Sequence, residues 1–143
     1  ITDVRNLGAI ARSAECAGAN GLIIPQQGSA PINQDAIKTS AGALLRLPVC
    51  KINNIKTFIN TIKAHDVRIY SASEKANSLY TQVNAEEPLM IVMGSEESGV
   101  SQTMIKMSDE LIKIPMNGEI ESLNVSAAAS VLLFEIVRQR LGI

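Results

Sequence analysis

The stretch LMIVMGSEESG, residues Leu89–Gly99, decides how the chain is interpreted. Its first part, Leu89–Met93, is apolar at every position, which is typical of a parallel β-strand covered on both faces. A loop with two glycines, Gly94–Gly99, follows directly, and a short helix is expected from Ser101. A strand that leads through a glycine loop into a helix indicates an α/β fold.

The same alternation extends outward in both directions. Strands are expected at Gly21–Ile24, Val49–Ile52, Val67–Tyr70 and Leu111–Ile114, and helices around Leu7–Ala17, from Asn54 to about Ala64 and from about Leu123 to Leu141. The connections are short, and no repeat or linker separates them. The sequence therefore predicts one α/β domain over residues 1–143, with a mostly parallel sheet and helices on both faces.

The composition excludes several classes of protein. The single histidine, His65, cannot build a multi-histidine metal site. Cys16 and Cys50 form no Cys-x-x-Cys pair, so neither a zinc knuckle nor a disulfide framework is expected. The apolar stretches are much shorter than the ~20 residues of a membrane span, and the first residues do not resemble a signal peptide. A cytoplasmic protein without metal or membrane contact is therefore expected.

The charge is small overall but uneven along the chain. A formal net charge of −1 argues against binding nucleic acid by bulk electrostatics alone. Residues 1–75, however, carry 9 basic and 5 acidic side chains, and residues 76–143 carry 4 and 9. This asymmetry can focus a polyanion on one region, and chance unevenness is an equal alternative.

The Gly94–Gly99 loop combines close-turning glycines with acidic side chains. Glu96 stands where a dinucleotide-binding loop has its second glycine, beside the pyrophosphate, and a carboxylate there would repel that ligand. The loop would instead suit a cationic or hydroxyl-bearing ligand, such as a sulfonium compound or a ribose. A plain acidic turn is the alternative interpretation.

Two further segments carry polar groups at positions of interest. Ser122, Asn124 and Ser126 precede or open the last helix, where they could bind polar ligand atoms or only cap the helix. Arg12 lies about 200° around the first helix from Ile10, so it projects away from the apolar stripe. It could bind a phosphate in a bidentate manner or be a solvated surface arginine.

Together the three segments resemble a known family. Asn6-x-Gly8-Ala9-x-x-Arg12, then Gly94-x-Glu96-x-x-Gly99, then Ile114-Pro-Met-x-Gly118-x-x-x-Ser122-Leu-Asn124-Val-Ser126 resemble motifs 1, 2 and 3 of the SpoU (TrmH-type) RNA 2′-O-ribose methyltransferases of the SPOUT superfamily. The resemblance implies methyl transfer from S-adenosylmethionine to a ribose 2′-hydroxyl of rRNA or tRNA, with rRNA favoured. It also implies a homodimer, and an α/β fold whose C-terminal segment forms a trefoil knot.

The resemblance also implies which residues form the site. The cofactor would be held by Ser71, Ala72, Ser73, Gly94, Ile114, Met116 and Leu123, and the catalytic residue would be Arg12, with Asn6, Glu96, Ser122 and Asn124 around it. Because no histidine is available as a base, Arg12 oriented by a substrate phosphate, which accepts the proton, is the mechanistic hypothesis. No metal is needed.

One departure and two alternatives accompany this interpretation. Family members usually have a strand before the segment that matches Thr2–Asn6, and often a separate RNA-binding domain. The chain is therefore expected to be the C-terminal, catalytic part of a longer protein.

The alternatives to the methyltransferase function are another transferase or nucleotide-binding α/β protein with convergent glycine loops, and a catalytically degenerate relative that binds RNA or a partner.

Overall fold

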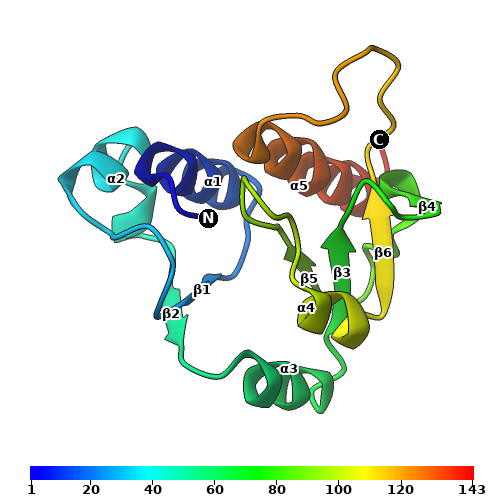
Figure 1. Cartoon of the computed structure of the whole chain (residues 1–143), viewed down its shortest axis with the longest axis horizontal. Helices are drawn as coiled ribbons and strands as arrows, with labels where there is room; N and C mark the ends of the chain where they lie inside the picture. Colours follow the sequence, from blue (N-terminus) through cyan, green and yellow to red (C-terminus); the bar gives the residue numbers. More distant parts are fainter. The chain divides into compact units, whose positions relative to one another are not determined.

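The computed structural model describes residues 1–143 and divides them into two units, Ile1–Ile55 and Lys56–Ile143 (Figure 1). The first unit contains α1 (Val4–Cys16), β1 (Leu22–Pro25), α2 (Gln34–Thr39), a 3-10 helix (Ala43–Leu45) and β2 (Val49–Ile52). Helix α3 (Ile55–Lys63) begins at the junction, and the second unit continues with β3 (Arg68–Ala72), β4 (Ser78–Leu79), a 3-10 helix (Tyr80–Gln82), β5 (Leu89–Val92), α4 (Gln102–Met107), β6 (Glu110–Lys113) and α5 (Val125–Leu141).

In the first unit, α1 packs beside α2 and a two-stranded parallel sheet. The side chain of Asp3 caps α1 by accepting hydrogen bonds from the backbone N–H groups of Arg5 (2.7 Å) and Asn6 (3.1 Å). Leu7 is buried against the β1 side of the unit. Gly8 lets α1 approach α2 closely, since an added Cβ would lie 2.7 Å from the carbonyl oxygen of Ala36.

In the second unit, four parallel strands pair in the order β4-β6-β3-β5. Tyr70 of β3 and Ile112 of β6 are buried in one cluster with Leu132 and Ile136 of α5. Helix α5 is therefore anchored on the sheet by its apolar side chains. None of the helices of the chain has both the length and the apolar character that a membrane span requires.

The α/β class and the parallel strands are confirmed, but the strands are divided between two sheets: β1 and β2 pair with each other, and the other four form the second sheet. Strand β3 extends to Ala72, two residues beyond its predicted end. Strand β5 is half-buried along its length, not covered on both faces, and it forms an edge of its sheet. The single domain and the helices on both faces stay predictions.

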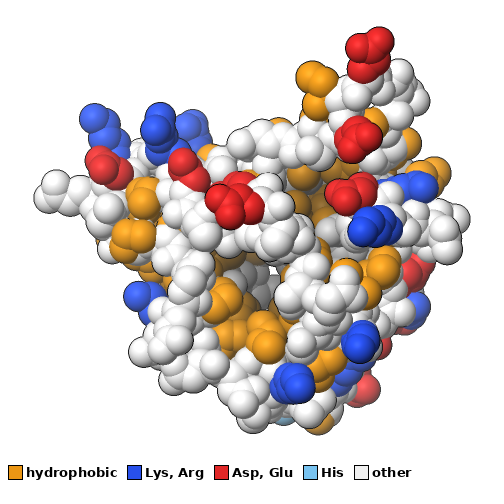
Figure 2. Space-filling model, viewed as in Figure 1, with side chains coloured by type: hydrophobic (Ala, Val, Ile, Leu, Met, Phe, Trp, Pro, Cys, Tyr) orange, Lys and Arg blue, Asp and Glu red, His pale blue; other side chains and the backbone are white.

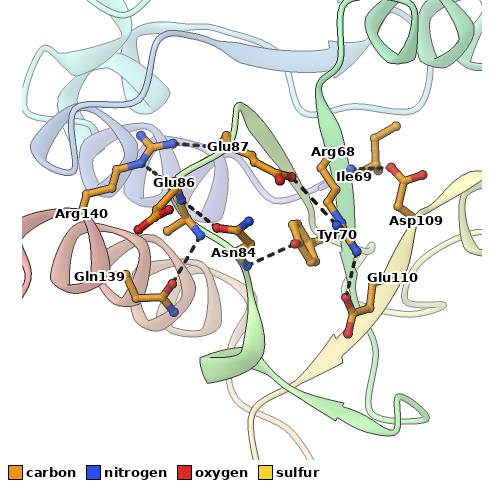
Figure 3. A network of polar contacts seen from close by, with 11 residues as sticks. Arg68, Ile69, Tyr70, Asn84, Glu86, Glu87, Asp109, Glu110, Gln139 and Arg140 are labelled. Atoms are coloured by element: carbon orange, nitrogen blue, oxygen red, sulfur yellow. Dashed lines mark hydrogen bonds and ion pairs between the residues drawn. The ribbon is translucent and has the colours of Figure 1, made fainter.

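A network of polar contacts ties α5 to the segment before β5 (Figure 3). Arg140 donates to the carbonyl oxygen of Ala85 (2.8 Å), and the N–H of Ala85 donates to the side chain of Gln139 (3.3 Å). The N–H of Asn84 donates to the hydroxyl of Tyr70 in β3 (3.2 Å). These contacts hold the second half of α5 in one position relative to β3.

Glu135 of α5 is a buried carboxylate with two donors. Arg138 Nε donates to it at 2.8 Å, and Gln139 Nε2 donates at 2.8 Å. Because these hydrogen bonds favour the charged form, in the order Arg138 then Gln139, the pKa of Glu135 falls from 4.5 to about 2. The charged form of Glu135 therefore contributes fully to the free energy of unfolding above about pH 4.5, and this contribution is lost as the pH falls towards 2.

We expect the substitution Glu135→Gln to lower the free energy of unfolding at neutral pH by ~2 kcal/mol, the scale of hydrogen bonds to charged groups. The difference between the variant and the parent chain should shrink as the pH is lowered from 4.5 towards 2, because protonation of Glu135 has the same effect on the parent. Urea unfolding at several pH values measures this. Glu119→Gln, in an exposed loop, is the control, and equal pH slopes for the parent chain and Glu135→Gln would contradict the expectation.

Candidate active site

Three loops leave the carboxyl edge of the four-stranded sheet. Strand β3 pairs in parallel with both β5 and β6, so the segments that follow these three strands emerge at the same edge. Ser71 is aligned with Val92 of β5 and with Leu111 of β6. The structure thus brings the segments after β3, β5 and β6 together at the place where parallel sheets bind ligands.

The loop after β5 is closed by its own backbone. Ser95 and Gly99 exchange two N–H···O hydrogen bonds of 3.0 Å, and the hydroxyls of Ser95 and Ser98 are 2.7 Å apart. Gly99 has a φ of +66°, a conformation that favours glycine. The closed loop presents the exposed Glu96 at its tip, as expected for a carboxylate that meets a ligand from solvent.

Gly94 allows the two ends of the loop to approach each other, because it has no side chain. A Cβ added at Gly94 would collide with the backbone of Gly99 and Val100. The space that the glycine leaves is therefore filled by the returning chain. Any contact of Gly94 with a ligand would have to use its backbone polar groups.

The loop after β6 leads into the N-terminus of α5, and most of its residues are exposed. Asn124 caps the helix: its Oδ1 accepts from the N–H groups of Ser126 (2.9 Å) and Ala127 (3.4 Å) and from the Ser126 hydroxyl (2.6 Å). The helix begins at Val125, two residues later than predicted. Ser122 lies outside the helix, two residues before the cap, and is exposed.

The same loop carries Ile114 and Met116 at its start and Leu123 near its end. Ile114 packs against the core of the second unit, whereas Leu123 is 42% exposed. Acidic side chains gather on the projecting part of this loop (Figure 2), where Glu119 and Glu121 are exposed. The loop therefore offers both apolar and acidic groups beside the carboxyl edge.

Of the three predicted residues at the end of β3, Ser71 and Ala72 belong to the strand and only Ser73 follows it. Ser71 is fully buried, and its hydroxyl lies 2.6 Å from the Ser108 hydroxyl, so its side chain is part of the sheet's packing. Ala72 ends the strand, and Ser73 continues the pairing, because its N–H donates to the carbonyl oxygen of Ile112 (2.9 Å). Ala72 and Ser73, both half-buried, lie closer to the site than Ser71 does.

Asn6 and Arg12 belong to α1 in the first unit. Asn6 lies within the first turn and is not the N-cap, since Asp3 has that role. Arg12 is exposed and takes part in none of the ion pairs of the chain. Its guanidinium group is available for an anionic ligand, and its role at the edge of the second unit stays a prediction.

Two surface pockets share no residue with these loops. The pocket of the first unit, about 620 Å³, is lined by Thr2, Asp3, Val4, Arg5, Asp35, Lys38 and Thr39. The pocket of the second unit, about 320 Å³, is lined by Lys56, Gln102, Thr103, Lys106 and Met107. Sequence reasoning missed both, because their residues come from separate helices.

No group of three or more His, Cys, Asp or Glu side chains is arranged to hold a metal ion.

Comparison with known proteins places these features in a family. The profile of the SpoU rRNA methylase family matches residues 1–134. The chain is 40% identical over 140 residues to the 23S rRNA (guanosine-2′-O-)-methyltransferase RlmB of Yersinia pestis, covering 98% of this chain and 57% of that protein.

Solved structures agree with this match. The SpoU methyltransferase AviRb of Streptomyces viridochromogenes, in complex with the cofactor AdoMet, superposes with a TM-score of 0.92 at 28% identity, covering 99% of this chain and 58% of that one. The TrmH/SpoU tRNA modifying enzyme of A. aeolicus superposes with a TM-score of 0.90 at 28% identity, covering 99% and 72%. The chain spans somewhat more than half the length of the RlmB relative that it matches. This chain belongs to the SpoU rRNA methylase family.

Proposed function

We propose that the chain is the catalytic domain of an RNA methyltransferase that transfers a methyl group from S-adenosylmethionine to a ribose 2′-hydroxyl. The observation that carries the proposal is the position of two of its three motifs: they follow β5 and β6, on the two sides of β3, at the carboxyl edge of one parallel sheet, in a chain that belongs to the SpoU family. Because the relatives named above include an RlmB that acts on 23S rRNA, rRNA is the favoured substrate over tRNA.

The residues at the edge fit S-adenosylmethionine. When bound, this cofactor supplies an electrophilic methyl group on a positively charged sulfur. Backbone groups around Gly94, Met116 and Leu123 would hold its polar ends, and Ile114 with Ala72 and Ser73 would line the same place. Ser71 would support the edge from within the sheet, since its hydroxyl is already paired with Ser108. The carboxylate of Glu96 suits a cationic ligand or a ribose hydroxyl.

The remaining site residues would act on the RNA. Arg12 would bind the phosphate next to the target ribose and thereby align the 2′-hydroxyl, whose proton passes to that phosphate. Asn6, in the first turn of the same helix, would act together with Arg12 on the RNA. Ser122 and the amide of Asn124 would position the ribose at the start of α5. In this scheme the chain accelerates the reaction by alignment and needs no metal ion.

We also propose that the chain works as a homodimer and that its C-terminal segment forms a trefoil knot, as the family resemblance implies. An apolar stripe on α5 supports the dimer: Val131 is 36% exposed, Phe134 48% and Leu141 65%, at positions that share one helix face. In a two-fold dimer, the same stripe of the second copy would cover this stripe. Analytical ultracentrifugation tests the dimer, and a sedimentation mass of one chain would contradict it.

The function is tested by cofactor binding and methyl transfer. Calorimetric titration of the chain with S-adenosylmethionine and with its demethylated product should show saturable binding of both. Incubation with rRNA and radiolabelled cofactor should then yield 2′-O-methylated nucleosides. Binding without methyl transfer to rRNA or tRNA would favour a degenerate relative that only binds RNA. Binding of neither compound would refute the proposed function.

A further inference from the structure

We propose that the pocket between α3 and α4 is a second anchoring site for RNA, which binds a phosphate of the substrate backbone away from the reacting ribose. This inference rests on the proposed function for the identity of the polyanion. The pocket lies wholly within the second unit and shares no residue with the three loops of the candidate active site.

The pocket is formed by α4 and the beginning of α3. Its volume is about 320 Å³, and five side chains line it: Lys56 of α3 and Gln102, Thr103, Lys106 and Met107 of α4. Both lysines are exposed, and basic side chains lie over α3 and α4 in Figure 2. The two ammonium groups therefore border the same hollow from different helices.

No carboxylate lines this pocket, and neither lysine is neutralised elsewhere. Lys56 and Lys106 take part in none of the ion pairs of the chain. Lys63, also on α3, behaves differently, since its ammonium lies 2.7 Å from Asp109. The second unit therefore keeps one lysine of α3 in a structural ion pair and leaves another, with Lys106, as uncompensated positive charge.

The chemistry of the lining selects a phosphate. Lysine ammonium groups bind phosphate as point charges, and the amide of Gln102 and the hydroxyl of Thr103 add uncharged donors for its oxygens. The side chain of Met107 gives the hollow an apolar part that a sugar can contact. A phosphodiester, with a charged centre between two riboses, matches this combination. A free mononucleotide shares the phosphate chemistry and is the competing source.

The test uses the full chain and the double variant Lys56→Gln/Lys106→Gln. Binding of a mixed-sequence single-stranded RNA oligonucleotide is measured by fluorescence anisotropy over a range of salt concentrations. The two lysines hold one phosphate between them, and each lost phosphate contact lowers the slope of log affinity against log salt by about 0.7, so the double variant should lose about 0.7. Its affinity at physiological salt should be roughly tenfold weaker. Lys56→Arg/Lys106→Arg should restore both.

The matched control is Lys51→Gln/Lys75→Gln, which removes two exposed lysine charges that do not line the pocket. It should keep the salt slope of the parent chain. Calorimetric binding of S-adenosylmethionine, measured on every variant, separates this inference from the proposed function, because cofactor affinity should not change in either double variant.

Three outcomes would overturn the inference. An unchanged RNA affinity and salt slope in Lys56→Gln/Lys106→Gln, with cofactor binding intact, would remove the pocket and leave the proposed function standing. An equal loss of slope in the control would mean that charge alone, and not this pocket, attracts RNA. Saturable, lysine-dependent binding of adenosine monophosphate without any change in RNA binding would assign the pocket to a small phosphate ligand.

Discussion

Replacement of Arg12 by alanine is expected to lower the rate of ribose methylation by about 100-fold or more, the scale of the loss when reacting groups are misaligned. The affinity for S-adenosylmethionine should not change, because the proposed cofactor contacts all lie in the second unit. Single-turnover methylation of rRNA with radiolabelled cofactor, together with calorimetric titration of the cofactor, measures both quantities.

The physical reason is that Arg12 would orient the phosphate that accepts the ribose proton, and the histidine of the chain is not placed to act as the base instead. This single histidine, His65, follows α3 and precedes β3, so it lies towards the amino edge of the sheet, opposite the three loops. Its Nδ1 is also 2.9 Å from the carbonyl oxygen of Thr61. A guanidinium group carries only donors, so Arg12 can orient a phosphate but not accept the proton itself.

Arg5→Ala is the matched control, since Arg5 lies seven residues from Arg12 and shares its face of α1 at ~100° per residue. It removes the same charge and should reduce the rate much less. Arg12→Lys keeps the charge without the bidentate geometry and should recover only part of the activity. Undiminished methylation by Arg12→Ala would exclude Arg12 from catalysis, and an equal loss in Arg5→Ala would reduce its role to general attraction of RNA.

Local patterns predicted most of the elements. Val49–Ile52 is β2 with the predicted bounds, and the apolar spacing of residues 54–64 is realised in α3. The six-residue α2 was missed because it is too short to show helical periodicity and follows a segment rich in glycine, serine and proline. The two-residue β4 was missed for the same reason of length.

Local patterns could not predict which strands pair with each other or which side chains meet. Periodicity shows that a strand exists, but not which strand it pairs with, so the separation of β1 and β2 from the other four strands had no signal in the sequence. The candidate site shows the same limit. The polar character of the loops could be predicted, yet only the structure reveals that Asn124 caps α5 and that the Ser71 hydroxyl is paired with Ser108.

The substitution Gly94→Ala is expected to destabilise the second unit and abolish cofactor binding. The added methyl group would collide with the main chain of Gly99 and Val100, which cannot move aside as a flexible side chain would. Relief would require breaking the paired hydrogen bonds between Ser95 and Gly99. Overpacking of this kind costs ~1–3 kcal/mol or more, and it would displace the loop that carries Glu96.

Gly118→Ala is the matched control, because a Cβ at Gly118, in the loop after β6, would meet no atom within 4 Å. Thermal unfolding of both variants, followed by cofactor titration well below the transition, separates instability from loss of the site. We expect Gly94→Ala to melt at a lower temperature and to bind no measurable S-adenosylmethionine even while folded, whereas Gly118→Ala should melt with the parent chain. If Gly94→Ala bound the cofactor with the parent's affinity, the closed conformation of this loop would not be needed at the site, and Gly94 would have a purely structural role.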